Sequence, residues 1–289
     1  MKSNHIQHLL EINLAVFFIA TSGALGRYVQ LPVTITIGAR AILAFLVLIL
    51  FCWWRNISFK IKRIDIPVIL LSGFLMCVHW VAYFYALKLS SVAIGMLSLF
   101  TYPVITAFLE PLMLGTKFQR IHLLLAFLVL TGMYFLSPNL DFQNSHTIAI
   151  AFGLLSALAY AIRNIILKKK VSKYNGTMLM VYQTAIAGIL LLPFLFTTSF
   201  EVILSQWQVL LALAVLTTAI GHTLFLMTFK HFTITTVSII SGIQPVYGIL
   251  IGVIFLSEIP KGTTILGGIL ILSSVVIESV RSNKQPKIS

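Results

Sequence analysis

Charged residues are scarce in this chain of 289 residues. They make up 9% of it, against about 25% in ordinary soluble domains, whereas 59% of the residues are apolar. A chain with so few charges cannot coat a soluble globule of this size with polar surface. Apolar runs of roughly 18 to 20 residues, long enough to cross a bilayer, recur along the whole sequence. The sequence therefore predicts a polytopic membrane protein.

Acidic residues and cysteines are also few. Seven Asp and Glu against twenty Lys and Arg give a net charge of +13, but the basic residues lie between apolar runs and not along one helix among aromatic residues. This pattern argues against nucleic-acid binding. Cys52 and Cys77 both lie inside apolar runs, so neither a disulfide scaffold nor a metal site is expected.

The motifs of the common enzymes are missing as well. The sequence has no phosphate-binding glycine loop, no serine nucleophile elbow, no zinc-binding His-Glu-x-x-His helix and no acidic pair with metal-like spacing. The longest connections, of about ten residues, leave no room for a nucleotide-binding domain. We therefore expect neither an enzyme nor an ATPase, and no cofactor.

Ten apolar runs are long enough to be membrane helices. Barrel strands would be about ten residues long and would alternate between polar and apolar residues, which these runs do not. The sequence thus predicts an all-α fold with ten transmembrane helices. Their expected ranges are 11–28, 32–54, 66–87, 91–115, 121–138, 147–168, 176–197, 207–229, 234–256 and 262–281.

Lys and Arg are distributed unevenly between the two sides. With the N-terminus placed inside, the inner segments carry fifteen of the twenty, and the outer segments carry only Arg27, Lys88 and Lys261. Positive charge favours the cytoplasmic side, so both termini are expected in the cytoplasm. The brief loops, the short basic tail and the lack of a targeting extension are typical of the bacterial inner membrane.

One stretch of the chain occurs twice. Residues 86–136 fall on residues 228–278 without a gap when they are moved by 142 positions. The offset places Tyr102-Pro103 on Gln244-Pro245, so both copies carry a proline near the middle of an apolar run. A gapless match that keeps the prolines indicates a duplicated half.

Ten spans and one duplication predict two repeats of five helices, residues 1–140 and 141–289. Because five is odd, the second repeat is inverted in the membrane relative to the first. Lys88 is then outside and Lys230 inside, although they occupy the same position in the repeat. Inverted repeats are the architecture of many secondary transporters.

In these features the chain resembles the ten-helix EamA-type members of the drug/metabolite transporter superfamily. The resemblance covers essentially the whole chain and rests on two short interhelical links, two mid-helix proline motifs and one acidic turn: Lys88, Lys230, Tyr102-Pro103, Gln244-Pro245 and Ser257-Glu258. The first repeat departs from the family pattern with Gly115-Thr116 at the acidic turn. The resemblance implies export of small organic solutes, such as amino acids or related metabolites.

Arg40 is the most unusual residue inside a span. It lies eight residues past Pro32, roughly 12 Å into the hydrocarbon at about 1.5 Å per residue. Polar groups in lipid normally face a bundle interior or an aqueous cavity. Two interpretations stay open: a cavity cation that meets a substrate carboxylate, or a clamp between helices that binds backbone carbonyls or Glu110. Gln183 is its counterpart in the seventh span and a candidate neutral partner for the substrate.

The third span carries His79, Trp80 and Tyr83. His79 and Tyr83 are four residues apart and share a helix face, with Trp80 beside them. The 142-residue offset places His222 on Trp80, so the two should face each other near the midplane, where such folds bind substrate. His79, His222 and Glu110 are candidates for proton coupling. The alternative is that each histidine is neutral and bonded to a neighbouring carbonyl.

The proline motifs supply further candidates. A proline inside a helix removes a backbone donor and bends the axis. We therefore predict hinges at Pro103 and Pro245, with Tyr102 and Gln244 facing the cavity beside them.

In the sixth span, Tyr160 and Asn164 share one side and are candidates for substrate binding. Arg163 is about one turn from Lys168, so we expect its side chain to extend to the inner surface.

The sequence as a whole predicts a secondary transporter that exports small organic solutes by alternating access through a central midplane cavity. Its expected partners are the lipid bilayer and a small-molecule substrate, and the protein is expected to be a monomer or a homodimer. One alternative is a non-transport scaffold or lipid-handling protein. A second is an exporter of cations or multiple drugs, against which the deep Arg40 argues.

Overall fold

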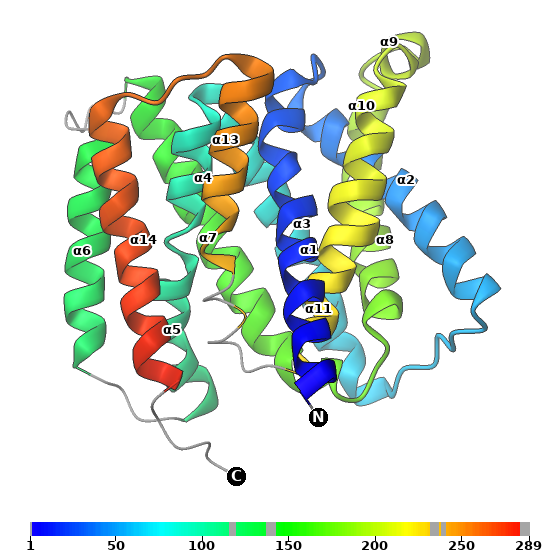
Figure 1. The fold of residues 1–289 in the computed structure, drawn as a ribbon. Helices are drawn as coiled ribbons and strands as arrows, with labels where there is room; N and C mark the ends of the chain where they lie inside the picture. The colour runs from blue at the N-terminus through cyan, green and yellow to red at the C-terminus, as the bar shows by residue number, and fades with distance from the viewer. Residues whose placement is uncertain (1, 116–119, 137–142, 232–236, 238–240, 284–289) are drawn as a thin grey trace.

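The computed structural model of the chain describes residues 2–115, 120–136, 143–231, 237 and 241–283. This part of the chain is a bundle of helices joined by short links, and it contains no strand (Figure 1). The first half holds α1 (Lys2–Tyr28), α2 (Val33–Trp54), the short 3-10 helix η1 (Arg63–Asp65), α3 (Ile66–Leu89), α4 (Val92–Leu99), α5 (Tyr102–Leu114) and α6 (Ile121–Leu136).

The second half has more breaks. It holds α7 (Ser145–Val171), α8 (Gly176–Leu195), α9 (Phe200–Leu204), α10 (Trp207–Ala212), the π-helix η2 (Leu213–His222), α11 (Thr223–Thr228), α13 (Gln244–Leu256) and α14 (Gly262–Asn283).

These helices confirm the predicted all-α polytopic fold. Seven helical segments are long and apolar enough to cross a membrane, and three shorter apolar helices accompany them. Together they coincide with the ten predicted spans, except that most of residues 234–243 lies outside the described part. The predicted boundary between residues 140 and 141 also lies outside it, so the division into two repeats stays a prediction.

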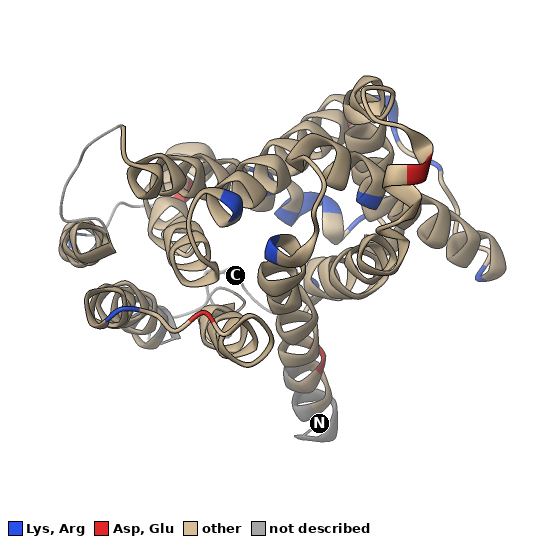
Figure 2. Ribbon diagram, turned by 90° about the horizontal axis from the view of Figure 1, so that it is seen from above, with Lys and Arg blue, Asp and Glu red and all other residues tan. Residues whose placement is uncertain are grey.

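The outer face of the bundle suits a lipid surrounding. Large apolar side chains point outward, among them Leu130, Ile254 and Phe255, which are 67%, 71% and 75% exposed. In Figure 2, which looks down on the bundle from above, long stretches of the ribbons carry no charged residue. Such a surface would be unusual in a soluble monomer.

The fourth span is broken at its proline motif. α4 ends at Leu99, and α5 begins at Tyr102 with Pro103 in its first turn. Proline is favourable at this position because the first backbone N–H groups of a helix have no intrahelical acceptor. α13 begins with Gln244-Pro245 in the same way. Both prolines therefore lie in the first turn of a helix, and the predicted hinges at these positions stay a prediction.

The eighth span contains an irregularity that the sequence analysis did not predict. Between α10 and α11 the chain forms the π-helix Leu213–His222. The hydroxyl of Thr218 donates to the carbonyl of Leu213, five residues earlier, at 3.2 Å. π-helical turns are rare and are often found at functional sites.

Helices of the two halves pack against each other throughout. α2 packs on α8, α6 on α14, and α4 on α13, and each of these pairs joins corresponding spans of the two predicted repeats. α3 packs on α7, and α1 packs on the π-helix. Exchange of the two repeats converts the first of these pairs into the second, because α3 corresponds to the span with the π-helix and α7 corresponds to α1. Figure 1 shows α6 and α14 side by side at one edge of the bundle.

The two ends of the bundle differ. α1 begins and α14 ends at the same end (Figure 1), which we call the terminal end. The links α2–α3 and α7–α8 lie there, whereas the links α1–α2, α3–α4 and α13–α14 lie at the opposite end.

Candidate functional site

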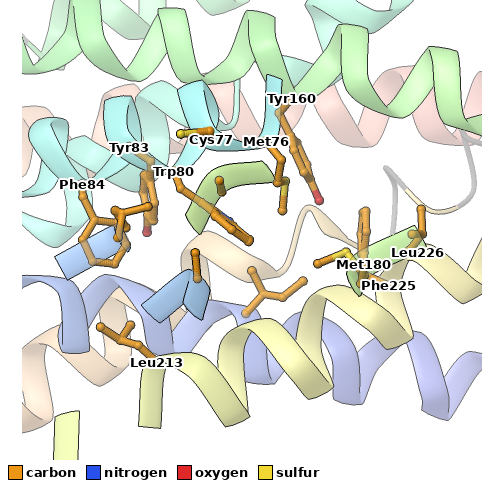
Figure 3. Packing of buried hydrophobic residues seen from close by; sticks show 14 of the residues in the cluster. Met76, Cys77, Trp80, Tyr83, Phe84, Tyr160, Met180, Leu213, Phe225 and Leu226 are labelled. Carbon is orange, nitrogen blue, oxygen red and sulfur yellow. The ribbon is translucent and has the colours of Figure 1, made fainter. Parts of the chain in front are cut away.

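A small cavity lies at the centre of the bundle. Its volume is about 10 Å³, which is room for about one water molecule. Eight of the ten residues predicted to bind substrate line it: Arg40, His79, Trp80, Tyr83, Tyr102, Tyr160, His222 and Gln244. The aromatic members belong to the main hydrophobic core, where Trp80, Tyr83 and Tyr160 lie among apolar side chains (Figure 3).

Arg40 is buried in this cavity with part of its hydrogen-bonding capacity unused. Its Nε donates to the hydroxyl of Thr218 at 2.7 Å, and its guanidinium carbon lies 4.6 Å from the ring centre of Trp80. Within the described residues, Nη1 and Nη2 have no hydrogen-bond partner. Leaving charged donors buried and unpaired is costly, so Arg40 keeps hydrogen-bonding capacity that its contacts with Thr218 and Trp80 do not use.

Glu110 is not the partner of Arg40, which removes one form of the clamp that the sequence left open. Glu110 lies in the last two turns of α5, near the terminal end of the bundle. There it accepts from Nζ of Lys168 at 3.2 Å. Its carboxylate therefore forms a partly exposed ion pair with Lys168 and does not neutralise the charge of Arg40 in the cavity.

Trp80 and His222 meet across the cavity. The indole N–H of Trp80 donates to Nε2 of His222 at 3.2 Å. Because an indole nitrogen can only donate, Nε2 of His222 carries no proton. His222 is therefore neutral with its proton on Nδ1, and this buried nitrogen has no partner among the described residues.

His79 is held by α7. Its Nδ1 lies 2.8 Å from the hydroxyl of Ser156, which itself donates to the carbonyl of His79 at 3.0 Å. Since the hydroxyl proton is engaged there, Nδ1 of His79 is the donor to Ser156. The imidazole also stacks on Tyr160 with 4.4 Å between ring centres. These contacts fix the ring in the cavity wall and keep Nδ1 protonated.

Arg163 overturns one expectation. Its side chain is fully buried and does not reach the surface. Its Nε donates to Oε1 of Gln183, and its Nη1 donates to Oδ1 of Asn164, both at 2.8 Å. The prediction that Arg163 extends to the inner surface is wrong, because α7 continues to Val171 and turns this residue toward α8. Gln183 and Asn164 hold Arg163 and do not line the cavity.

Sequence reasoning missed four lining residues and the partner of Arg40. Ser22 and Ile19 line the cavity from α1. Leu99 and Phe100 line it from the end of α4. The 142-residue offset pairs Ser22 with Asn164 and could have found it. Thr218 has a weaker signal, the adjacent hydroxyls Thr217-Thr218 within an apolar run.

An ion pair closes the bundle at the opposite end. Glu258 accepts from Nε of Arg27 and from the backbone N–H of Val92, both at 2.8 Å. Arg27 also donates from Nη1 to the carbonyl of Lys88 at 3.1 Å. The carboxylate thus joins the end of α13 to α1 and to the positive N-terminus of α4.

The terminal end is closed by a second set of contacts. Asp65 accepts from Nζ of Lys170 and from the hydroxyl of Tyr174, which lies 2.6 Å away. This hydrogen bond raises the pKa of the Tyr174 phenol, because it is made to an anionic acceptor. The central cavity therefore lies between closed contacts at both ends of the bundle.

Comparisons with known proteins agree with this architecture. The sequence model of the EamA-like transporter family matches residues 9–137 and again residues 147–280. The pseudopaline exporter CntI of Pseudomonas aeruginosa is 25% identical over 232 residues, which cover 79% of this chain and 80% of that protein. An uncharacterized transporter of Archaeoglobus fulgidus is 28% identical over 197 residues, 68% of this chain and 70% of that protein.

A solved crystal structure shows the same fold. The superposition of the two covers 96% of this chain and 99% of the solved chain, with a TM-score of 0.71 and 17% sequence identity. The two family matches together span most of the sequence and agree with the resemblance drawn from its motifs. The chain therefore belongs to the EamA-like transporter family, whose members are membrane transporters and not enzymes.

Proposed function

We propose that the protein is a secondary transporter that exports small organic solutes, such as amino acids or related metabolites, through the central cavity by alternating access. The observation that carries the proposal is the buried guanidinium of Arg40, whose Nη1 and Nη2 have no partner among the described residues, in a closed cavity at the centre of the bundle. A relative named as an exporter of pseudopaline supports the direction of transport and a small organic substrate.

The helix packing supports alternating access. The packed pairs are the same when the two predicted repeats, residues 1–140 and 141–289, are exchanged. In an inverted repeat, such symmetry gives two packings of similar energy, one open to each side. The closed cavity then represents a form between them.

Movement of the bundle is proposed to centre on the two proline motifs. Pro103 and Pro245 each lie in the first turn of a helix, directly after an interruption of the helical span. Such an interruption lets the angle at the start of α5 and of α13 change without disrupting a continuous helix. Tyr102 and Gln244 lie directly at these breaks and line the cavity, so a hinge there would change the shape of the site.

Orientation follows from the positive-inside rule. The terminal end, with Lys168, Lys170 and Lys173, would face the cytoplasm of a bacterial cell, and both termini would lie there. Solutes would then enter the cavity from the terminal end and leave past Glu258.

Among the three candidates for proton coupling, His79 has the most suitable geometry. It can accept a proton on Nε2 while Nδ1 still donates to Ser156. Protonation of Nε2 in His222 would remove the acceptor for Trp80, and Glu110 is paired with Lys168 at 3.2 Å. We therefore propose that any proton coupling acts through His79.

Uptake into energised inside-out vesicles tests the proposal. We expect saturable uptake of one or more labelled solutes from a pool of amino acids and organic acids. Arg40→Gln should abolish it, whereas Arg55→Gln, a change at an exposed residue, should not. Absence of uptake of every solute, by protein that is folded and inserted, would reject the proposal. Loss of uptake on collapse of the pH gradient would establish proton coupling, and His79→Gln should then be uncoupled.

Lipid handling is a second candidate, supported by a different cavity. An almost entirely apolar pocket of about 520 Å³ lies among α5, α6 and α7, with Val104, Phe108 and Val129 in its wall. A lipid tail would fit such a lining. A scramblase would move labelled phospholipid between leaflets of proteoliposomes, and Arg40→Gln would leave that movement unchanged.

A further inference from the structure

We infer that the central cavity selects organic acids that carry a carboxylate and a net negative charge, in preference to zwitterionic amino acids and to cations. The inference deepens the proposed function and rests on it, because it takes the central cavity as the substrate site. Three unpartnered hydrogen-bond donors and the absence of a neighbouring carboxylate among the described residues carry the argument.

The donors come from two residues on one cavity. Nη1 and Nη2 of Arg40 and Nδ1 of His222 are buried and have no partner within the described part of the chain. The two guanidinium nitrogens form a fork that matches the two oxygens of a carboxylate. The Nδ1–H of His222 adds a third donor. The hydroxyl of Tyr83, in the same lining, is buried without a partner as well. A planar oxyanion can accept from donors of all these kinds, so it is the ligand that we infer.

Trp80 acts as a positioning residue in this arrangement. Its N–H binds Nε2 of His222 and so places the histidine proton on Nδ1. Its ring also lies against the guanidinium of Arg40 at 4.6 Å. One side chain thereby orients both groups that would hold the anion.

No acidic side chain among the described residues lines this cavity. The chain has seven acidic residues in all. Five have described side chains, and they lie in ion pairs near the two ends or at exposed positions: Asp65, Glu110, Glu258, Glu11 and Glu201. Asp141 and the side chain of Glu278 lie outside the described part of the chain.

This imbalance decides which solutes the cavity prefers. The ammonium group of an amino acid would find only neutral acceptors here, such as Gln244 and the tyrosine hydroxyls, and it would lie close to a buried guanidinium. In a poorly hydrated site that repulsion is weakly screened. In a zwitterion, the repulsion between its ammonium group and Arg40 therefore cancels part of the binding free energy that its carboxylate contributes. A cation has no favourable interaction with Arg40.

The rest of the cavity wall indicates the body of the solute. Phe100, Tyr102 and Tyr160 present aromatic surface, and Tyr102 and Tyr160 meet edge to face with 5.1 Å between ring centres. An apolar or aromatic body attached to a carboxylate matches this wall. Because the closed cavity holds only about one water, such a solute binds when the bundle opens. Closure around it then brings its carboxylate to Nη1 and Nη2 of Arg40.

Binding measurements on the purified protein test the inference with a matched series. 3-Phenylpropionate, phenylalanine, 3-phenylpropanamide and phenethylamine share one ring and differ in charge: anion, zwitterion, neutral amide and cation. We expect 3-phenylpropionate to bind at least about tenfold more tightly than each of the others. Arg40→Gln should remove this preference, Arg40→Lys should keep part of it, and Arg55→Gln should not change it.

The role of His222 has its own pair of variants. Gln at this position can accept from Trp80 and still offer an N–H, so His222→Gln should keep the preference for the anion. His222→Phe offers no donor and should reduce it several-fold, with the protein still folded.

Two results would overturn the inference. The first is equal or tighter binding of phenylalanine than of 3-phenylpropionate, or no binding by any member of the series. The second is a preference for the anion that persists in folded Arg40→Gln. Vesicle uptake separates this failure from that of the proposed function, since saturable export of any other solute would leave transport established and only the anion preference rejected.

Discussion

Trp80 donates a hydrogen bond to His222 at 3.2 Å, and the two residues are 142 positions apart, the offset that superposes the first half of the sequence on the second. Residues at equivalent positions of a twofold repeat can touch each other only near the symmetry axis. The contact therefore lies where the axis of the two predicted repeats would pass. It also brings together the two residues that the sequence analysis expected to face each other.

Replacing Trp80 should disturb the proton on His222 more than it disturbs the fold. Trp80→Phe keeps an aromatic ring but leaves Nε2 of His222 without a donor. We expect a loss of stability of about 1–3 kcal/mol, the usual effect of one unsatisfied buried group. NMR of 15N-labelled histidine should show His222 protonated on Nδ1 in the wild type and a mixture of tautomers in the variant. An unchanged tautomer would mean that Trp80 does not set it.

The two buried arginines should respond oppositely to the same substitution. Arg40→Met removes a buried charge with two unpartnered nitrogens, so thermal stability should be unchanged or higher while transport is lost. Arg163→Met leaves the side-chain oxygens of Gln183 and Asn164 without their donor. Its stability should fall by about 1–3 kcal/mol.

Thermal unfolding in detergent, together with vesicle uptake, measures both effects. Equal destabilisation by the two changes would instead identify Arg40 as a clamp between helices, the other interpretation that the sequence left open.

The contact between α6 and α14 should depend on one glycine. A Cβ built on Gly267 would lie 2.5 Å from the carbonyl oxygen of Gly132, and backbone cannot move aside as a side chain can. We expect Gly267→Ala to destabilise the protein by about 1–3 kcal/mol through overpacking. Gly262→Ala in the same helix is the matched control, because its Cβ would meet nothing within 4 Å. If both variants unfold at the same temperature, the two helices are not in close contact.

The sequence predicted the helices well because length and hydrophobicity decide them. Each of the ten apolar runs exceeds any connection between them, and in lipid only a helix satisfies the backbone of such a run. The same principle placed Arg40, His79 and His222 inside the bundle. The repeat then supplied a long-range contact, between Trp80 and His222, that no local pattern contains.

Other features depend on tertiary packing and have no signal in the sequence. The π-helix Leu213–His222 is one, since ordinary membrane helices contain the same types of residue. The burial of Arg163 is another. Its distance from Lys168 along the chain suggested the membrane surface, but its direction is set by contact with Gln183 on α8. The unpaired Nη1 and Nη2 of Arg40 are a third, because the sequence offered Glu110 as a partner and Glu110 instead pairs with Lys168.

The ion pair between Glu258 and Arg27 should control access to the cavity from the opposite end. Both side chains are partly exposed, 21% and 31%, so the pair is worth about 0.5–1 kcal/mol. Glu258→Gln keeps the shape of the side chain but removes its charge, which also weakens its bond to the N–H of Val92. The balance should therefore shift roughly twofold to fivefold toward forms open at this end.

A single cysteine at position 22 can report the change, in a background where Cys52 and Cys77 are replaced by serine. Ser22 lines the cavity, so a membrane-impermeant thiol reagent added outside intact cells should label the Ser22→Cys protein faster when Glu258→Gln is also present. Glu201→Gln is the control, because this carboxylate is exposed on α9 and away from the ion pair. Equal labelling rates with and without Glu258→Gln would show that the pair does not hold this end closed. Faster labelling from the terminal end alone would show instead that the bundle opens to the side opposite the one we propose.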